Sequence, residues 1–271
     1  MRINQNVAAF NAYRNLSATN VDLAKSLEKL SSGYRINRAA DDAAGLVTSE
    51  SMRAEIRGTR QAIRNAQDGI SFVQTAEGAL NEVHSILQRM RELAVSAANT
   101  GVTDGSAQQD EITELLAEIS AIGTRTTFAG NTVFADYSGT SLDFHVGPNS
   151  GDTMSISSDL ALSSSDVFGT DLSSVDVSAD ADTAITTIDG AITAVSGGRA
   201  ELGATQNRFE HVVASLSVAA ENLSASESRV RDVDLAEEMV SFTRHQIMAQ
   251  AGTAMLAQAN QIPSTVLALI R

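Results

Sequence analysis

Apolar residues recur three and four positions apart along most of the chain, a spacing that gathers them on one face of an α-helix. The first such stripe stops after Leu30 at Ser31-Ser32-Gly33, where small residues and a glycine end a helix. Its members are Ile3, Val7, Phe10, Tyr13, Leu16, Leu23, Leu27 and Leu30. The amino-terminal segment is therefore expected to form one amphipathic helix.

Three further stripes predict two long helices and one short helix. The pattern from about residue 44 to 99 predicts a helix ~80 Å long, which a domain of this size can bury only against another rod. A second stripe is apolar at every seventh position, namely Ile188, Val195, Leu202, Phe209, Leu216, Leu223 and Val230. A third, short rod carries Ile112, Leu115, Ile119 and Ile122. These patterns predict a mainly α fold, a long antiparallel coiled-coil helical bundle.

One stretch between the rods alternates like β-structure. Leu142, Phe144 and Val146 alternate with polar residues, a turn follows at 147–151, and the alternation resumes at Met154. A small β-hairpin is therefore predicted within about 126–160. Residues 157–184 are rich in serine and aspartate, and we expect them to form an exposed, loosely folded lobe.

The carboxyl-terminal segment carries a stripe similar to the first one. It consists of Met248, Ala251, Met255, Ala259, Ile262, Val266 and Leu269, and Pro263 is expected to bend the helix that bears it. Each end alone buries too little apolar surface to hold its shape in water. We therefore expect the two end helices to pair, and their pairing to remain incomplete without neighbouring molecules.

Charge and composition exclude several classes of function. The net charge is −14, and residues 101–198 hold fifteen acids but one basic residue, Arg125, so a nucleic-acid partner is not expected. Asp180 and Asp182 are two carboxylates without further ligands, and the four histidines are scattered, so no metal site is expected. No catalytic set or phosphate-binding loop can be singled out, so neither an enzyme nor a cofactor is expected.

Targeting signals are also missing from the pattern. The sequence contains no run of about 18 apolar residues, the length needed to span a membrane. Its first ten residues, MRINQNVAAF, do not have the pattern of a cleavable signal peptide. Taken alone, these features indicate a cytoplasmic protein.

Several motifs resemble the signatures of bacterial flagellins. They are LSSGYRINRAADDAAGL at 30–46, RNAQDGIS at 64–71, QTAEGAL at 74–80, LQRMRELAVSAAN at 87–99, ENLSASESRVRDVDLAEEM at 221–239 and QAGTAMLAQANQ at 250–261. The resemblance covers about 1–135 and 195–271, and FHVGPNSGDTMSIS at 144–157 is similar to the family's core hairpin. Many flagellins insert large outer domains in the middle, whereas this chain is short.

The resemblance implies a domain plan and a route of secretion. Residues 1–43 and 229–271 would form domain D0, the inner tube of a flagellar filament, and 44–228 would form the surrounding domain D1. Ile3, Val7, Phe10, Leu16, Leu23, Leu27, Leu30, Met248, Met255, Ile262, Val266 and Leu269 would carry polymerisation. The chain would be exported unfolded by a type III apparatus, which replaces the cytoplasmic interpretation. Its partners would be itself, an export chaperone, and the cap and junction proteins.

The resemblance also implies a partner outside the bacterium, the flagellin-sensing Toll-like receptor of animals. The family's receptor motif matches Gln88–Leu93, with Arg89 and Leu93 at the positions that matter, and Glu111 lies on the next rod. Because Leu87 and Met90 belong to the apolar seam, we expect Arg89 and Leu93, four residues apart, to share an exposed outer face. Arg89 and Glu92 could equally make ion pairs between subunits.

Two alternatives to a filament subunit remain open. A hook–filament junction protein resembles flagellin at both ends, although the match over 64–99 favours flagellin. A secreted enzyme or adhesin on a helical stalk would need a folded middle domain, for which 157–184 is too short.

Overall fold

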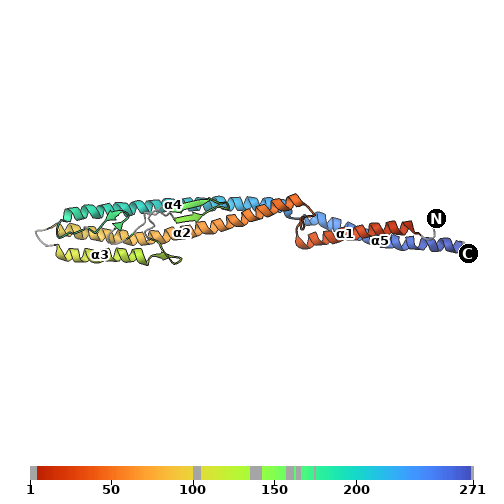
Figure 1. Ribbon diagram of the computed structural model, residues 1–271, viewed down its shortest axis with the longest axis horizontal. Coiled ribbons are helices and arrows are strands. Elements are labelled where there is room, and N and C mark those ends of the chain that lie inside the picture. Colours follow the sequence, from red (N-terminus) through yellow and green to blue (C-terminus); the bar gives the residue numbers. More distant parts are fainter. Residues whose placement is uncertain are drawn as a thin grey trace. The chain divides into compact units, whose positions relative to one another are not determined.

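A computed structural model describes residues 5–99, 105–134, 142–156, 162, 166–173 and 175–269, with the backbone alone for 262–269. Its five helices are α1 (Val7–Ser32), α2 (Ala43–Ala97), α3 (Ser106–Arg125), α4 (Ala181–Arg231) and α5 (Leu235–Leu269). Their arrangement is shown in Figure 1. The fold is therefore mainly helical, and the five predicted helices are confirmed to within a few residues at each end.

The chain divides into two compact units whose boundaries fall inside helices. Unit 1 comprises 1–54 and 222–271, and unit 2 comprises 55–221. The units therefore divide at 54/55 and 221/222, whereas the sequence placed the division at 43/44 and 228/229.

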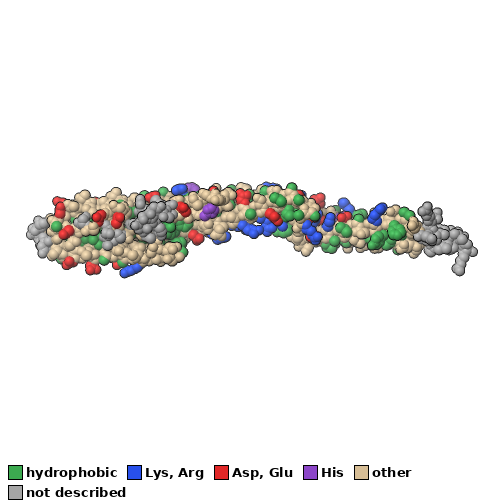
Figure 2. Space-filling model, in the orientation of Figure 1, with side chains coloured by type: hydrophobic (Ala, Val, Ile, Leu, Met, Phe, Trp, Pro, Cys, Tyr) green, Lys and Arg blue, Asp and Glu red, His purple; other side chains and the backbone are tan. Residues whose placement is uncertain are grey.

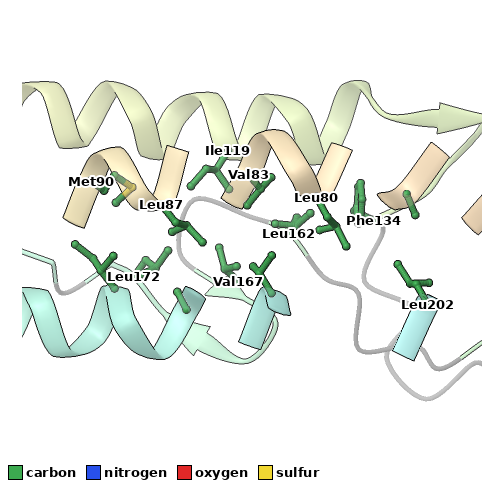
Figure 3. Packing of buried hydrophobic residues seen from close by; sticks show 14 of the residues in the cluster. Leu80, Val83, Leu87, Met90, Ile119, Phe134, Leu162, Val167, Leu172 and Leu202 are labelled. Atoms are coloured by element: carbon green, nitrogen blue, oxygen red, sulfur yellow. The ribbon is translucent and has the colours of Figure 1, made fainter. Parts of the chain in front are cut away.

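Unit 2 is a helical bundle in which α2, α3 and α4 lie side by side (Figure 1). On α2, Leu80, Val83, Leu87 and Met90 are fully buried, and Ile112 and Ile119 of α3 join them. Figure 3 shows the four α2 side chains and Ile119 packing with Leu202 of α4 and with side chains of the segment between α3 and α4, among them Val167. The seven-residue repeat of α4 is confirmed from Ile188 to Phe209, whereas Leu216, Leu223 and Val230 are half-buried.

The strands form three antiparallel pairs. These are β1 (Thr127–Phe128) with β2 (Asn131–Thr132), β3 (Leu142–His145) with β4 (Thr153–Ile156), and β5 (Asp166–Val167) with β6 (Thr170–Asp171). The predicted hairpin is β3–β4, in which Leu142 pairs with Ile156 and Phe144 with Met154.

The β3–β4 hairpin is held to the bundle by aromatic packing. The Phe144 ring lies edge-on to Phe209 of α4 at 5.6 Å between centroids, and at 5.9 Å from Phe72 of α2. A Cβ at Gly69 would lie 2.7 Å from the Phe209 ring, so a glycine is required where this ring meets α2. The hairpin therefore covers the core rather than projecting from it.

The expectation of an exposed lobe over 157–184 is wrong for the residues that the structure describes. Six described side chains of this stretch are buried in the core of unit 2, namely Leu162, Val167, Leu172, Val175, Val177 and Ala184. The β5–β6 turn places Phe168 and Gly169 at positive φ, and the Phe168 ring lies where a Cβ at Gly198 would stand. The segment is therefore fastened to α4. Its few apolar residues are irregularly spaced, so no helical or strand period revealed their burial.

Unit 1 contains the connection between α1 and α2, built from the run 30–46. Gly33 ends α1, as the sequence predicted; its φ is 75°, and its N–H donates to the Lys29 carbonyl. The Arg35 N–H donates to the Arg231 carbonyl at 2.7 Å, and the Arg231 guanidinium lies 4.8 Å from the centre of the Tyr34 ring. This motif therefore joins the start of the chain to the end of α4.

Asp41 organises the tight turn that precedes α2. Its carboxylate accepts hydrogen bonds from the backbone N–H groups of Arg38 and Asn37, at 2.9 and 3.1 Å. These bonds favour the ionised form and lower the pKa of Asp41 below its ordinary value.

Candidate assembly surfaces

The two ends of the chain pair, as predicted, through a seam of small residues. Alpha carbons of α1 and α5 approach within 8 Å of each other. Gly252 permits this approach, because a Cβ there would lie 3.1 Å from Leu16, and Ser26 and Ala259 are buried in the same seam. Asn6 donates from its side chain to the Ala259 carbonyl at 2.8 Å. These contacts define an antiparallel α1–α5 hairpin.

The seam of α5 agrees with the predicted stripe at Ala259 but not at Met248 and Met255. The residues of α5 that face α1 include Gly252 and Ala259, and a salt bridge between Lys29 and Glu238 at 3.7 Å closes the other end. Met248 and Met255, which the sequence placed on the pairing stripe, are instead exposed. The intervening small residues pack closely, so the larger methionines are left on the outside.

A second apolar face on α5 has no partner among the described residues. We call it the α5 outer stripe, and it consists of Leu235, Met239, Val240, Ile247, Met248 and Met255. Met239, Val240, Thr243, Arg244, Ile247 and Met248 line a shallow, open hollow on this helix. A helix that is apolar on both its paired and its free face is typical of one buried in a larger assembly.

The predicted polymerisation residues of α1 divide into two groups. Leu16, Leu23 and Leu30 are half-buried in the α1–α5 hairpin. Val7, Phe10 and Leu27 are exposed by 65%, 70% and 49%, together with Tyr13 and Val21, which we call the α1 outer stripe. Figure 2 shows apolar side chains on the surface of this hairpin. Ile3 lies outside the described residues, as do the side chains of Ile262, Val266 and Leu269; α5 itself continues through Pro263.

The sequence pattern missed Met239, Val240 and Ile247 of the α5 outer stripe. The three-four spacing picks out one face of α5, whereas apolar residues surround this helix. The lack of a polar face was the feature of the sequence that could have indicated a second buried surface on α5.

The predicted receptor patch is partly assembled in the structure. Arg89 of α2 contacts Glu111 of α3 at 2.9 Å and Glu92 at 3.4 Å, and the hydrogen bond to Glu111 is the main cause of a raised pKa for Arg89. Leu93, however, is 7% exposed and belongs to the core of unit 2. The prediction that Leu93 shares an exposed face with Arg89 is therefore wrong. Leu93 is three residues beyond the buried Met90 on the helix, a spacing that also places it on the core face.

The described part of the chain offers no arrangement typical of a metal site. Within it, no group of three or more histidine, cysteine or carboxylate side chains converges. His84 lies against its own helix, with its ring nitrogen Nε2 3.0 Å from the Gln88 amide. No helix of the described residues is long and apolar enough to cross a membrane.

Comparison with known proteins identifies the family. The profile for the bacterial flagellin N-terminal helical region matches residues 3–139, and that for the C-terminal helical region matches 185–270. The chain belongs to the bacterial flagellin family. Flagellin of Halalkalibacterium halodurans is 52% identical over 275 residues, and flagellin of Bacillus subtilis is 47% identical over 306 residues, with all of each chain covered. A crystal structure of Bacillus cereus flagellin is 30% identical, covers 60% of this chain and 94% of that chain, and has a TM-score of 0.45.

Membership of the flagellin family decides the broad function. The protein is a structural subunit of the bacterial flagellum, assembles with copies of itself into the filament used for motility, and is located outside the cell. The cytoplasmic interpretation drawn from the missing signal peptide is therefore wrong. The full-length matches are to flagellins, which favours the filament subunit over the junction-protein and stalked-enzyme alternatives.

Proposed function

We propose that this flagellin polymerises through the outer stripes of α1 and α5, which become the buried inner layer of the filament. In this assignment the terminal segments 1–43 and 229–271 supply domain D0 and 44–228 supply domain D1. The supporting observation is that α5 packs one apolar face on α1 and leaves a second one exposed to water. A surface of this kind is stabilised only when another molecule covers it.

Burial of the outer stripes supplies the free energy of assembly. Fully burying a methionine, valine or isoleucine side chain contributes roughly 1.5–3 kcal/mol. The α5 outer stripe alone offers six such large apolar side chains. A head-to-tail contact that does not close on itself then generates a helical polymer rather than a ring.

The double substitution Val240→Asn with Ile247→Asn tests this proposal. Both side chains are about 60% exposed in the subunit, so the monomer should keep its helix content and its melting temperature within about 2 °C. Seeded elongation, followed by light scattering and electron microscopy, should slow by about a hundredfold or more, because two apolar contacts per subunit are lost. Gln246→Asn, on the same helix, serves as the matched control and should elongate normally. Unchanged elongation of the double variant would show that this face of α5 makes no contact between subunits.

We further propose that the chain is exported unfolded through a type III channel, with an export chaperone, and meets cap and junction proteins at its destination. The sequence contains no cysteine, so no disulfide has to be broken before the chain is threaded. The exposed stripes are surfaces that a chaperone would have to cover before export. In this role the chain acts without a catalytic group or a cofactor.

A second proposed role is recognition of the monomer by the animal Toll-like receptor through Arg89 and Glu111. The supporting observation is that these two residues, from different helices, form one exposed charged surface. Arg89→Ala should weaken reporter-cell activation by roughly tenfold, because a charge-assisted contact contributes about 1.5–3 kcal/mol. Arg125→Ala, which removes another arginine paired with an acid, is the matched control and should retain activity.

Leu93 needs a separate measurement in the same assay. Because Leu93 is buried, Leu93→Ala should lower the thermal stability of unit 2 as well as the response. Equal activation by the normal protein and by Arg89→Ala would exclude the proposed receptor surface.

A further inference from the structure

Three arginines of α2 form a basic stripe whose partner is not visible within the subunit. Arg57, Arg60 and Arg64 are three and four residues apart, and all are exposed. Ala62 and Ala66 of the same helix are buried, so the arginines occupy the face turned away from the core. We call these three residues the α2 basic stripe.

The α2 basic stripe lacks the acidic partners that most other arginines of unit 2 have; among the described residues only Arg208 of α4 shares this lack. Arg89, Arg91, Arg125 and Arg199 each lie 2.6–3.8 Å from a carboxylate of the same subunit. Among the described residues, Arg57, Arg60 and Arg64 make no ion pair, and Arg64 donates instead to Gln61. Three like charges on adjacent turns repel one another unless an acidic surface faces them.

An acidic surface of matching spacing lies on α3. Asp110 and Glu114 are four residues apart, both are exposed, and neither makes an ion pair with a described residue. Ile112 and Ile119 are buried on the opposite face of that helix. We call Asp110 and Glu114 the α3 acidic pair. Its spacing equals that of Arg60 and Arg64, about 6 Å along a helix axis.

The two surfaces cannot meet inside one subunit. Arg89 contacts Glu111, so the α3 acidic pair lies at the level of Arg89 on α2. Arg60 and Arg64 precede that level by about 26 residues, which is roughly 40 Å of helix. A second molecule is therefore needed to join them.

We propose that the α2 basic stripe of one subunit docks on the α3 acidic pair of a second copy, displaced along the rods by about 40 Å. This inference rests on the self-assembly of the chain. A second copy fits better than another partner because every copy carries the acid-rich segment 101–198, and the net charge is −14. Charge pairs of this kind set the register and the rate of association more than its total affinity.

Reversal of each surface in turn, followed by reversal of both, tests the proposal. Arg60→Glu with Arg64→Glu should slow seeded elongation by about tenfold at low salt, and Asp110→Lys with Glu114→Lys should do the same, because like charges then face each other. The variant carrying all four substitutions should regain most of the lost rate. At about 0.5 M salt, where the screening length is roughly 4 Å, the differences should shrink. Arg208→Glu, an exposed arginine of α4 without an acidic partner among the described residues, is the matched control and should elongate normally.

The outcomes separate this inference from the proposed assembly through α1 and α5. If all charge variants elongated at the rate of the normal protein, the inference would be overturned. The proposed role of the outer stripes would not be affected by that result. Slow elongation that the fourfold variant does not restore would also overturn it, since the stripe would then face a different surface. If the arginine reversals left elongation unchanged but abolished binding to anionic phosphatidylserine vesicles, the stripe would belong to a membrane surface instead. Monomer melting temperatures, expected to be equal, check that each variant is folded.

Discussion

Removal of either end helix, residues 1–32 or 235–271, is expected to abolish filament formation while leaving unit 2 folded. The α1–α5 hairpin carries the outer stripes, and neither helix keeps a partner when the other is deleted. An isolated amphipathic helix gains little stability in water, so the remaining helix should also lose its order. Circular dichroism should therefore show a loss of helix larger than the deleted segment accounts for.

Electron microscopy after seeding gives the decisive measurement for these deletions. The full-length chain under the same conditions is the control for competent seeds. Filaments of normal diameter from a chain that lacks α1 or α5 would contradict the assignment of the ends to the inner layer. Loss of the melting transition of unit 2 would show instead that the two units depend on each other for folding.

The second large effect is expected in the core of unit 2. Leu202 of α4 is 2% exposed and belongs to the core of unit 2. Leu202→Ala should therefore lower the free energy of unfolding by roughly 2–5 kcal/mol. For a unit of this size the melting temperature should fall by roughly 4–20 °C. Leu216→Ala removes the same atoms two heptads later, where the side chain is half-buried, and should cost distinctly less.

Thermal melts of the full chain compare these two variants. Asp182→Asn, at an exposed position of α4, provides a control that should change stability by less than about 0.5 kcal/mol. Equal losses for Leu202→Ala and Leu216→Ala would mean that burial along α4 is uniform, against the gradient that the structure shows.

The helices were predictable because each signal is local and repeated. The apolar stripe of α2 recurs over fifteen turns, and Gly33 supplies the left-handed residue that ends α1. The β3–β4 hairpin was predictable for the same reason, since alternation and a glycine-bearing turn lie within fifteen residues of each other. The flagellin motifs then connected these elements to a filament.

The directions in which side chains face were less predictable. Leu93 lies three residues from Met90 and four from Arg89, so its spacing fits either the seam or the outer face. In the packed bundle it belongs to the core. In α5, the small residues Gly252 and Ala259 approach α1 closely, and this approach turns Met248 and Met255 outward.

The sequence by itself determined the helical character and the helix ends, because these depend on residues that are close together in the chain, and its motifs identified the family. The pairing of the two termini was predictable for a different reason, since each end carries a similar apolar stripe that it cannot bury alone. Only the tertiary structure decided how far each predicted stripe is covered and which residues at its margins are buried. Leu162, Val167 and Leu172 illustrate the difference, since their spacing of five residues fits neither a helix nor a strand, and they are buried because the segment folds back onto α4. The same holds for the α2 basic stripe and the α3 acidic pair, whose separation depends on how α3 lies along α2. Burial and charge pairing between distant segments are properties of the packed chain, and a local pattern does not encode them.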